Sequence, residues 1–465
     1  MAFLIVLAAL AFLMFAAYRG HSVILFAPLA ALGAVLLTDP SLVAPMFTGL
    51  FMDKMVGFLK LYFPVFLLGA VFGKLIEISG FSKSIVAATI GLVGRSRAML
   101  SIVIVCALLT YGGVSLFVVV FAVYPFAAEL FRQSDIPKRL IPGTIALGAF
   151  TFTMDALPGT PQIQNVIPTT FFHTTTWAAP WLGTIGALFV LALGLSYLEW
   201  RRRSAAANGE GYGAEHVNEP DAFGGARLAP APLAILPLVV VGVANFLLTH
   251  AIPRWYGPTQ SFSPSVVGET APIVQDVGKI AAIWAVEGAL LAGIVCVIAF
   301  AWRPVTRAFT TGTKAAVAGA LLASMNTASE YGFGAVIAAL PGFRVVADAL
   351  RAIPHPLVNE AVSVTALAGI TGSASGGMSI ALAAMADTFM QAAAAANIPP
   401  EVLQRVAAMA SGGMDTLPHN GAVITLLAVT GLTHRQSYRD IFAITLVKTL
   451  AVFFVIVVFG LTGWV

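Results

Sequence analysis

Two five-residue stretches of the same type place an ionisable side chain beside a proline inside segments that are otherwise apolar. Met154–Pro158 reads Met-Asp-Ala-Leu-Pro, and Met414–Pro418, 260 residues later, reads Met-Asp-Thr-Leu-Pro. A proline interrupts a helix. A carboxylate at membrane depth is costly, so such residues are rare unless they have a function. We therefore expect Asp155 and Asp415 to lie at helix breaks, where each could carry a coupling proton, hold sodium, or cap the helix that restarts after the break.

Short polar side chains follow each break and are candidates for contact with a small substrate. A third ionisable residue, Glu330, stands in the polar run Asn326–Gly332 and is a further candidate for ion coupling. Its counterpart in the first half of the chain, near Leu68, is apolar. The polar residues predicted to face the substrate are Thr160, Gln162 and Asn165 after the first break and His419 and Asn420 after the second.

Two clusters of glycine and serine interrupt long apolar stretches. Glycines permit a sharp turn at membrane depth, and the backbone N–H groups freed there can bind an anion without a buried lysine or arginine. Serine hydroxyls would add neutral donors. The alternative is that glycine and serine only allow helices to pack closely. The residues predicted to bind a substrate carboxylate are Gly112, Gly113 and Ser115 in the first cluster and Ser373, Ser375, Gly376, Gly377 and Ser379 in the second.

The elements that must position these residues are membrane-spanning helices. Hydrophobic residues make up 59% of the chain and charged residues 10%, against about 25% charged in an average soluble protein. The net charge of +4 comes from residues in short loops and gives no support to nucleic-acid binding. Cys106 and Cys296 both fall inside apolar runs, so the sequence predicts neither a disulfide framework nor a metal centre, and no cofactor.

The repeated motifs belong to a wider duplication. Several pairs of short motifs recur in the same order at a nearly constant separation of 262 to 264 residues. Internal duplications of this kind are typical of secondary transporters. The further pairs are Gly112–Ser115 with Gly376–Ser379, Ile136-Pro137 with Ile398-Pro399, and Gly80-Phe81 with Gly342-Phe343.

Basic residues in short loops predict how the chain crosses the membrane. Met99–Phe131 has basic residues at both ends, so it is predicted to enter and leave on one side as a re-entrant hairpin, and Leu357–Ala396 is its counterpart. Each half then has five crossings and one hairpin, and because five is odd the halves are inverted. The other predicted segments are Ala2–Tyr18, Ser22–Leu37, Phe58–Ile78, the amphipathic Lys83–Gly94, Leu140–Phe172 with a break at Asp155–Pro161, Trp181–Leu198, Leu233–Leu248, Ile280–Trp302, Ala315–Leu340, Val402–Leu427 with a break at Asp415–Gly421, and Ile441–Val465.

The predicted fold is an all-α polytopic membrane protein with two inverted-topology repeats and helices broken near the midplane. Residues 1–200 and 231–465 are the repeats, joined by a flexible cytoplasmic linker at residues 201–230. Residues 98–172 and 357–430 form the predicted transport core, and the remaining helices form a scaffold.

At these motifs the chain resembles the gluconate permease family of the ion transporter superfamily. The resemblance runs over almost the whole chain, and the order of elements is more specific than any single motif. It implies an elevator mechanism, a homodimer in the lipid of the bacterial inner membrane, and uptake of small organic anions with protons. The stretches that carry the resemblance are Tyr111–Phe117, Lys138–Gly143, Met154–Pro161 and Ser411–Asn420.

The first break departs from the gluconate-type members of that family. Those members tend to carry a Pro-Pro-His-Pro-Gly-Pro-like run, whereas Leu157–Gln162 reads Leu-Pro-Gly-Thr-Pro-Gln. This version looks more like members for short hydroxy acids, including 3-hydroxybutyrate. The resemblance therefore implies a symporter for a small hydroxy-monocarboxylate coupled to H⁺ or Na⁺, and not an enzyme. Gluconate, another sugar acid and citrate are the alternative substrates.

An intramembrane serine protease is the alternative of a different class. Ser373–Gly376 is close to a Gly-x-Ser-Gly pattern, and His419 could act as its base. The first glycine of that pattern is absent, however, and a protease needs no inverted duplication.

Overall fold

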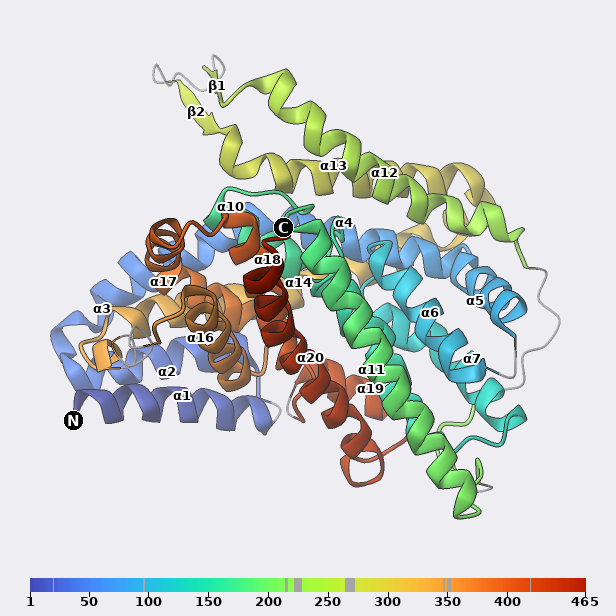
Figure 1. The fold of residues 1–465 in the computed structure, drawn as a ribbon. Coiled ribbons are helices and arrows are strands. Elements are labelled where there is room, and N and C mark those ends of the chain that lie inside the picture. Colours follow the sequence, from blue (N-terminus) through green and yellow to red (C-terminus); the bar gives the residue numbers. More distant parts are fainter. Residues whose placement is uncertain are drawn as a thin grey trace.

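The computed structural model describes residues 1–19, 21–94, 97–213, 216–220, 228–263, 272–345, 348, 353–418 and 420–465. The described chain is built almost entirely of helices (Figure 1). Its helices of nine residues or more are α1 (Ala2–Tyr18), α2 (Val23–Thr38), α4 (Met52–Ile78), α5 (Phe81–Val93), α6 (Ala98–Tyr111), α7 (Leu116–Gln133), α8 (Ile141–Ala149), α10 (Ile163–Phe172), α11 (Pro180–Ala207), α12 (Ala231–Tyr256), α13 (Val277–Phe300), α14 (Trp302–Ala339), α16 (Pro356–Thr371), α17 (Ala374–Ala395), α18 (Pro400–Gly413), α19 (Gly421–Thr430) and α20 (His434–Thr462).

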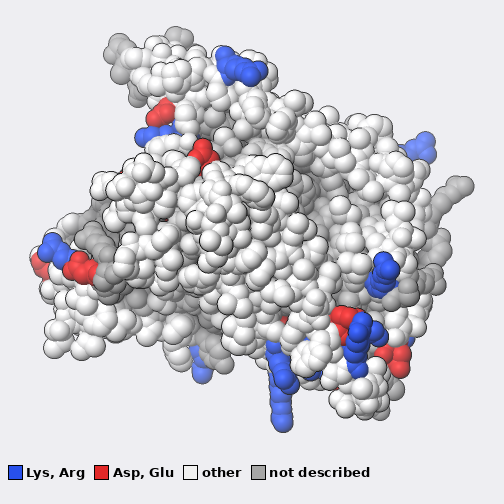
Figure 2. All heavy atoms as spheres, in the orientation of Figure 1, with Lys and Arg blue, Asp and Glu red and all other residues white. Residues whose placement is uncertain are grey.

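The length and composition of these helices make the chain a multi-pass membrane protein. Six described helical stretches are long and apolar enough to cross a bilayer. Figure 2 shows a broad uncharged surface, with most of the Lys, Arg, Asp and Glu side chains near its margins. The six stretches are Pro40–Ile78, which includes α4, and the helices α11, α12, α13, α17 and α20.

Each segment predicted as a re-entrant hairpin forms a pair of packed helices. α6 packs against α7 and α16 against α17. Gly113 (φ +95°) and Gly372 (φ +68°) adopt the left-handed conformation in the two turns, which a residue with a Cβ rarely adopts. The second turn is shorter than expected, because Gly376 and Gly377 already belong to the first turn of α17.

Both predicted helix breaks are also present. The first lies between the short helix α9 (Phe152–Asp155) and α10, and the second between α18 and α19. Asp155 is the last residue of α9, and Asp415 lies in the turn after α18. The first segment breaks a second time, because α8 ends at Ala149.

Several helices extend beyond the predicted spans. α14 begins at Trp302 rather than Ala315, and α11 continues to Ala207, so the first residues of the predicted flexible linker are helical. The predictions followed apolar content, whereas arginine and alanine also favour helices outside the lipid. The loop after α12 contains an antiparallel pair of strands, β1 (Thr259–Phe262) and β2 (Ile273–Asp276), which the all-α prediction did not include.

Two long helices organise the packing. α20 runs between α11 and α16 (Figure 1) and packs against α8, α11, α16 and α18. α14 packs along α4 and α2 and against α17. The last helix therefore contacts the elements that carry both breaks, and α14 contacts the second hairpin.

Candidate functional site

Each hairpin tip is hydrogen-bonded to the helix break of its own half. In the first half, Gln162 Nε2 donates to Thr110 O at 2.7 Å, and Tyr111 Oη donates to Pro158 O at 2.8 Å. In the second half, Asn420 Nδ2 donates to Gly372 O at 2.8 Å. Gln162 and Asn420 are both N-cap residues of the helix that follows the break. The predicted tips and breaks thus form two local units of the same design.

The glycines of the tips serve packing as well as turning. A Cβ on Gly377 would overlap the backbone of Ala368, and a Cβ on Gly112 would collide with Leu238 of α12. The alternative interpretation, in which small residues allow close helix packing, therefore applies to these two positions.

The N-terminus of α7 has no side-chain cap. Ser115 is its N-cap and makes no side-chain capping bond. Opposite it lies Gly73 of α4, whose missing Cβ would sit 3.5 Å from the Ser115 backbone nitrogen. Free N–H groups at the start of a helix favour negative charge, so this turn is compatible in charge with a carboxylate.

The N-terminus of α17 is surrounded by side chains of the protein. Ser373 caps it by accepting a hydrogen bond from Gly376 N at 3.1 Å. Ser375 Oγ lies 3.3 Å from Thr327 Oγ1 of α14. The carboxylate of Glu330, also on α14, lies against Gly376. The two tips therefore differ in charge although they share a design.

A buried lysine lies beside the first of the two repeated aspartates. Lys448 of α20 is 3% exposed, and its Nζ lies 3.8 Å from Asp155 Oδ2. It donates a hydrogen bond of 2.5 Å to Phe150 O, at the end of α8. Asp415 also acts on Lys448 electrostatically. Lys448 explains why two carboxylates are tolerated here, because a buried charge is stable only with a partner.

A buried arginine links the first break to α18. Arg405 is fully buried, and its guanidinium donates to Asp155 O at 2.8 Å, to Ala178 O at 2.7 Å and to Asn165 Oδ1 at 3.1 Å. Five fixed donors make arginine suited to holding several acceptors at once. Arg405 therefore fixes the backbone of the first break against the second half of the chain.

A full-length relative shows what kind of protein this is. The chain is 60% identical to the uncharacterized transporter YxjC of Bacillus subtilis (strain 168), and the match covers 100% of both chains. The chain belongs to the family of this transporter. No established protein-family model matches it. The crystal structure of the Alcanivorax borkumensis YdaH transporter is similar at 17% identity with a TM-score of 0.49, over 92% of this chain and 90% of that one.

In this transporter, several residues predicted to face a substrate are engaged with the protein itself. Thr160 Oγ1 donates to Thr153 O at 2.8 Å, and Ser379 Oγ donates to Ser375 O at 2.7 Å. Asn165 is fully buried and donates to Thr160 O and Thr176 O, while Asn420 also donates to Asp415 Oδ1. These bonds hold the two breaks in shape. His419 lies outside the described residues.

Sequence reasoning did not single out Arg405 and Lys448, the two buried basic residues near Asp155. Arg405 and Lys448 stand inside predicted spans, and an ionisable residue at membrane depth was itself a sufficient signal. It also missed Glu360 of α16, which is fully buried and whose two carboxylate oxygens have no hydrogen-bond partner.

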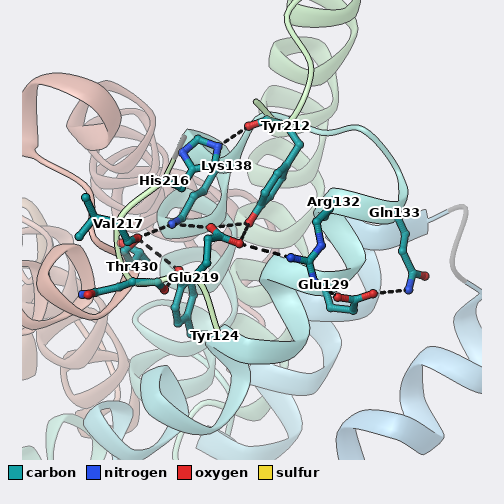
Figure 3. Close-up of polar contacts among 11 residues, drawn as sticks. Tyr124, Glu129, Arg132, Gln133, Lys138, Tyr212, His216, Val217, Glu219 and Thr430 are labelled. Carbon is teal, nitrogen blue, oxygen red and sulfur yellow. Dashed lines mark hydrogen bonds and ion pairs between the residues drawn. The ribbon is translucent and has the colours of Figure 1, made fainter. Parts of the chain in front are cut away.

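The described linker residues pack against α7, Lys138 and α19 (Figure 3). Lys138 Nζ is bonded to Glu219 Oε1 and to Val217 O, each at 2.8 Å, and Tyr124 Oη donates to Asn218 O at 2.7 Å. Asn218 Nδ2 in turn donates to Ala428 O of α19 at 3.0 Å. We call residues 210–213 and 216–219 the docked linker.

Two glutamates of the docked linker have lowered pKa values. The hydrogen bond from Arg139 lowers the pKa of Glu210. Burial would raise the pKa of Glu219, but hydrogen bonds from Lys138 and Tyr212 outweigh it, so the net pKa is lower than usual. Both side chains therefore bind the transporter as carboxylates at neutral pH.

Proposed function

We propose that this transporter is a secondary active symporter that carries a small hydroxy-monocarboxylate, such as 3-hydroxybutyrate, together with protons. The uncapped N-terminus of α7 beside Gly73 is the observation that carries the proposal, because its backbone N–H groups are compatible in charge with one carboxylate. Ser115 and the neighbouring backbone N–H groups would bind that carboxylate. Gln162, which is half-buried, would order the hydroxyl end, and Asp155, Asp415 and Glu330 are the candidates for ion coupling.

The order of elements supports the duplication, and the proposed mechanism is that the two repeats are inverted and work as an elevator. A long helix, a hairpin, a broken helix and a final helix follow one another in each half, as α4, α6–α7, α8–α10 and α11 and then as α14, α16–α17, α18–α19 and α20. In the proposed cycle the hairpins and broken helices, residues 98–172 and 357–430, move as one core against the other helices in a bacterial inner-membrane homodimer.

The sequence resemblance favours the gluconate permease family and a short substrate, with gluconate and citrate as competing candidates. A protease is disfavoured, since Ser375 Oγ contacts a threonine hydroxyl and no described histidine is bonded to it. The full-length relative is also named as a transporter and not as a protease.

Uptake of radiolabelled 3-hydroxybutyrate into proteoliposomes tests the proposal, with a proton gradient and a sodium gradient imposed separately. We expect accumulation driven by protons alone and blocked by unlabelled 3-hydroxybutyrate but not by gluconate or citrate. Accumulation driven only by sodium would contradict proton coupling. An absence of uptake by folded protein under either gradient would contradict the substrate.

A further inference from the structure

Glu330 reaches the first turn of α17 from a neighbouring helix. Its Oε2 fills the position that a Cβ on residue 376 would take, and its Cδ is 2.6 Å from that position. Glu330 is 4% exposed, its carboxyl group is hydrogen-bonded to the Ser373 side chain, and its Oε2 has no hydrogen-bond partner. A buried carboxylate oxygen without a partner is costly in an anion, and a proton bound at Oε2 would remove that cost.

A second carboxylate lies at the same helix turn. Asp415 is hydrogen-bonded to the backbone of Ala374, the first residue of α17, and it acts electrostatically on Glu330. Two carboxylates that share one site do not both ionise easily, because the like charges repel. One proton bound to either acid relieves this repulsion.

The charges of the buried residues Lys448, Arg405, Asp155 and Asp415 also indicate one bound proton. Lys448 lies beside Asp155 and acts on Asp415, and Arg405 acts electrostatically on Asp155. These two cations and two aspartates balance in charge. Glu330 is the additional acid, so the cluster is neutral when Glu330 carries a proton.

The elements around α14 supply no cation to Glu330. α14 packs against α2, α4, α13, α17 and η2 (Phe47–Phe51), and neither α2 nor η2 contains an ionisable residue. No ion pair to Glu330 is present in the described part of the chain, where Lys74 pairs with Glu77 and Lys279 with Asp276. The other ionisable groups on these elements are Asp53, Lys54, Lys60, Tyr62, Glu287, Cys296 and Asp387, and α14 itself also carries Arg303, Arg307, Lys314 and Tyr331.

We propose that Glu330 and Asp415 form a carboxylate pair that binds the transported proton at the first turn of α17. The substrate carboxylate would bind at the other tip, beside Gly73, where no acidic side chain of the described residues is hydrogen-bonded to the first turn of α7. One proton enters from water on one side of the membrane and leaves to water on the other side with one substrate monoanion, so the cycle moves no net charge. This transport consequence rests on the proposed symport, but proton binding by the pair does not.

The two acids belong to different parts of the proposed elevator. Glu330 stands on α14 of the scaffold, and Asp415 belongs to the transport core. Movement of the core would separate the two carboxylates, change the repulsion between them, and so release the proton. Proton binding would then depend on the position of the core.

Infrared difference spectra of the full-length protein in lipid nanodiscs, taken between acidic and alkaline pH without substrate, test the pair directly. We expect a carbonyl stretch from a buried protonated carboxyl group that appears on acidification and is lost in Glu330→Gln. In Asp415→Asn the midpoint of this change should move to more acidic pH, because the repelling charge is gone. Full retention of the change in Glu330→Gln, or an unchanged midpoint in Asp415→Asn, would overturn the proposal.

Glu360→Gln is the matched control for these spectra. Glu360 is also buried and unpartnered, but it lies on α16 away from the tip, so its removal should leave the midpoint where it is. If Glu330→Gln does not fold, the midpoint shift in Asp415→Asn still decides the question.

Transport measurements separate this inference from the proposed function. Glu330→Gln should keep exchange of labelled for unlabelled 3-hydroxybutyrate across the membrane and lose accumulation driven by a proton gradient. If wild-type protein does not transport 3-hydroxybutyrate, the proposed substrate is wrong, and the spectra still decide whether the pair binds a proton.

Discussion

Lys448 is a buried base that interacts electrostatically with both repeated aspartates, Asp155 and Asp415. Its replacement in Lys448→Met keeps a similar side-chain length but leaves Asp155 without its nearest cation. Breaking a buried ion pair on one side costs about 3–5 kcal/mol. We therefore expect a large fall in thermal stability of the purified protein, measured by its melting in detergent.

The double variant Lys448→Met with Asp155→Asn removes both charges and should recover most of the lost stability. As a control, Lys279→Met disrupts an exposed ion pair with Asp276 of 3.6 Å, worth about 1 kcal/mol or less. A double variant no more stable than Lys448→Met alone would show that the ion pair is not the reason.

At the scale of elements, the docked linker connects α7 of the first hairpin to α19, the helix after the second break. The side chain of Lys138 is only 1% exposed, so Glu219→Gln removes the charge partner of a buried ammonium. A charge-assisted hydrogen bond contributes about 1.5–3 kcal/mol, so hydrogen exchange at Tyr212 and Val217 should become faster by about tenfold or more. Glu199→Gln, whose pairs with Arg202 and Arg203 stay within α11, should leave this exchange unchanged.

Acid should have the same effect on the docked linker. Because the pKa of Glu219 and of Glu210 lies below the ordinary 4.5, their contribution to stability is complete above pH 4.5 and is lost as the pH falls through the lower folded values. Exchange corrected for its intrinsic pH dependence should therefore rise in wild-type protein below pH 4.5 and rise less in Glu219→Gln. Equal rises in both proteins would exclude Glu219 as a cause.

At the scale of the whole molecule, an elevator requires the second hairpin to move along α14. Thr327 and Ser375 face each other across this contact, with hydroxyl oxygens 3.3 Å apart. In a background with Cys106→Ala and Cys296→Ala, a disulfide between Thr327→Cys and Ser375→Cys should abolish uptake, and a reductant should restore it.

A cross-link within the proposed core is the control for this experiment. Thr365 Oγ1 donates to Ala410 O at 3.1 Å, and both residues belong to the segment 357–430. Thr365→Cys with Ala410→Cys should therefore leave uptake active after oxidation. If the oxidised Thr327–Ser375 pair still transports, this contact does not change during the cycle.

The sequence by itself determined the features that depend on local chemistry. Apolar run length decides which segments enter lipid, and glycine and proline decide where such a segment turns or breaks, so the hairpins and both breaks were predictable. Asp155, Asp415 and Glu330 were recognisable because an acid at membrane depth is rare. The repeat, the elevator and the roles of the tip residues stay predictions.

Only the tertiary structure decided which charges meet. Lys448 and Arg405 lie far along the chain from Asp155, and the face that each helix turns inward depends on packing that no local pattern encodes. The same holds for Glu330, which reaches α17 from α14 while its counterpart tip faces Gly73. The difference between two tips of one design is therefore a property of the packed helices, since each tip takes its charge from a helix outside its own hairpin.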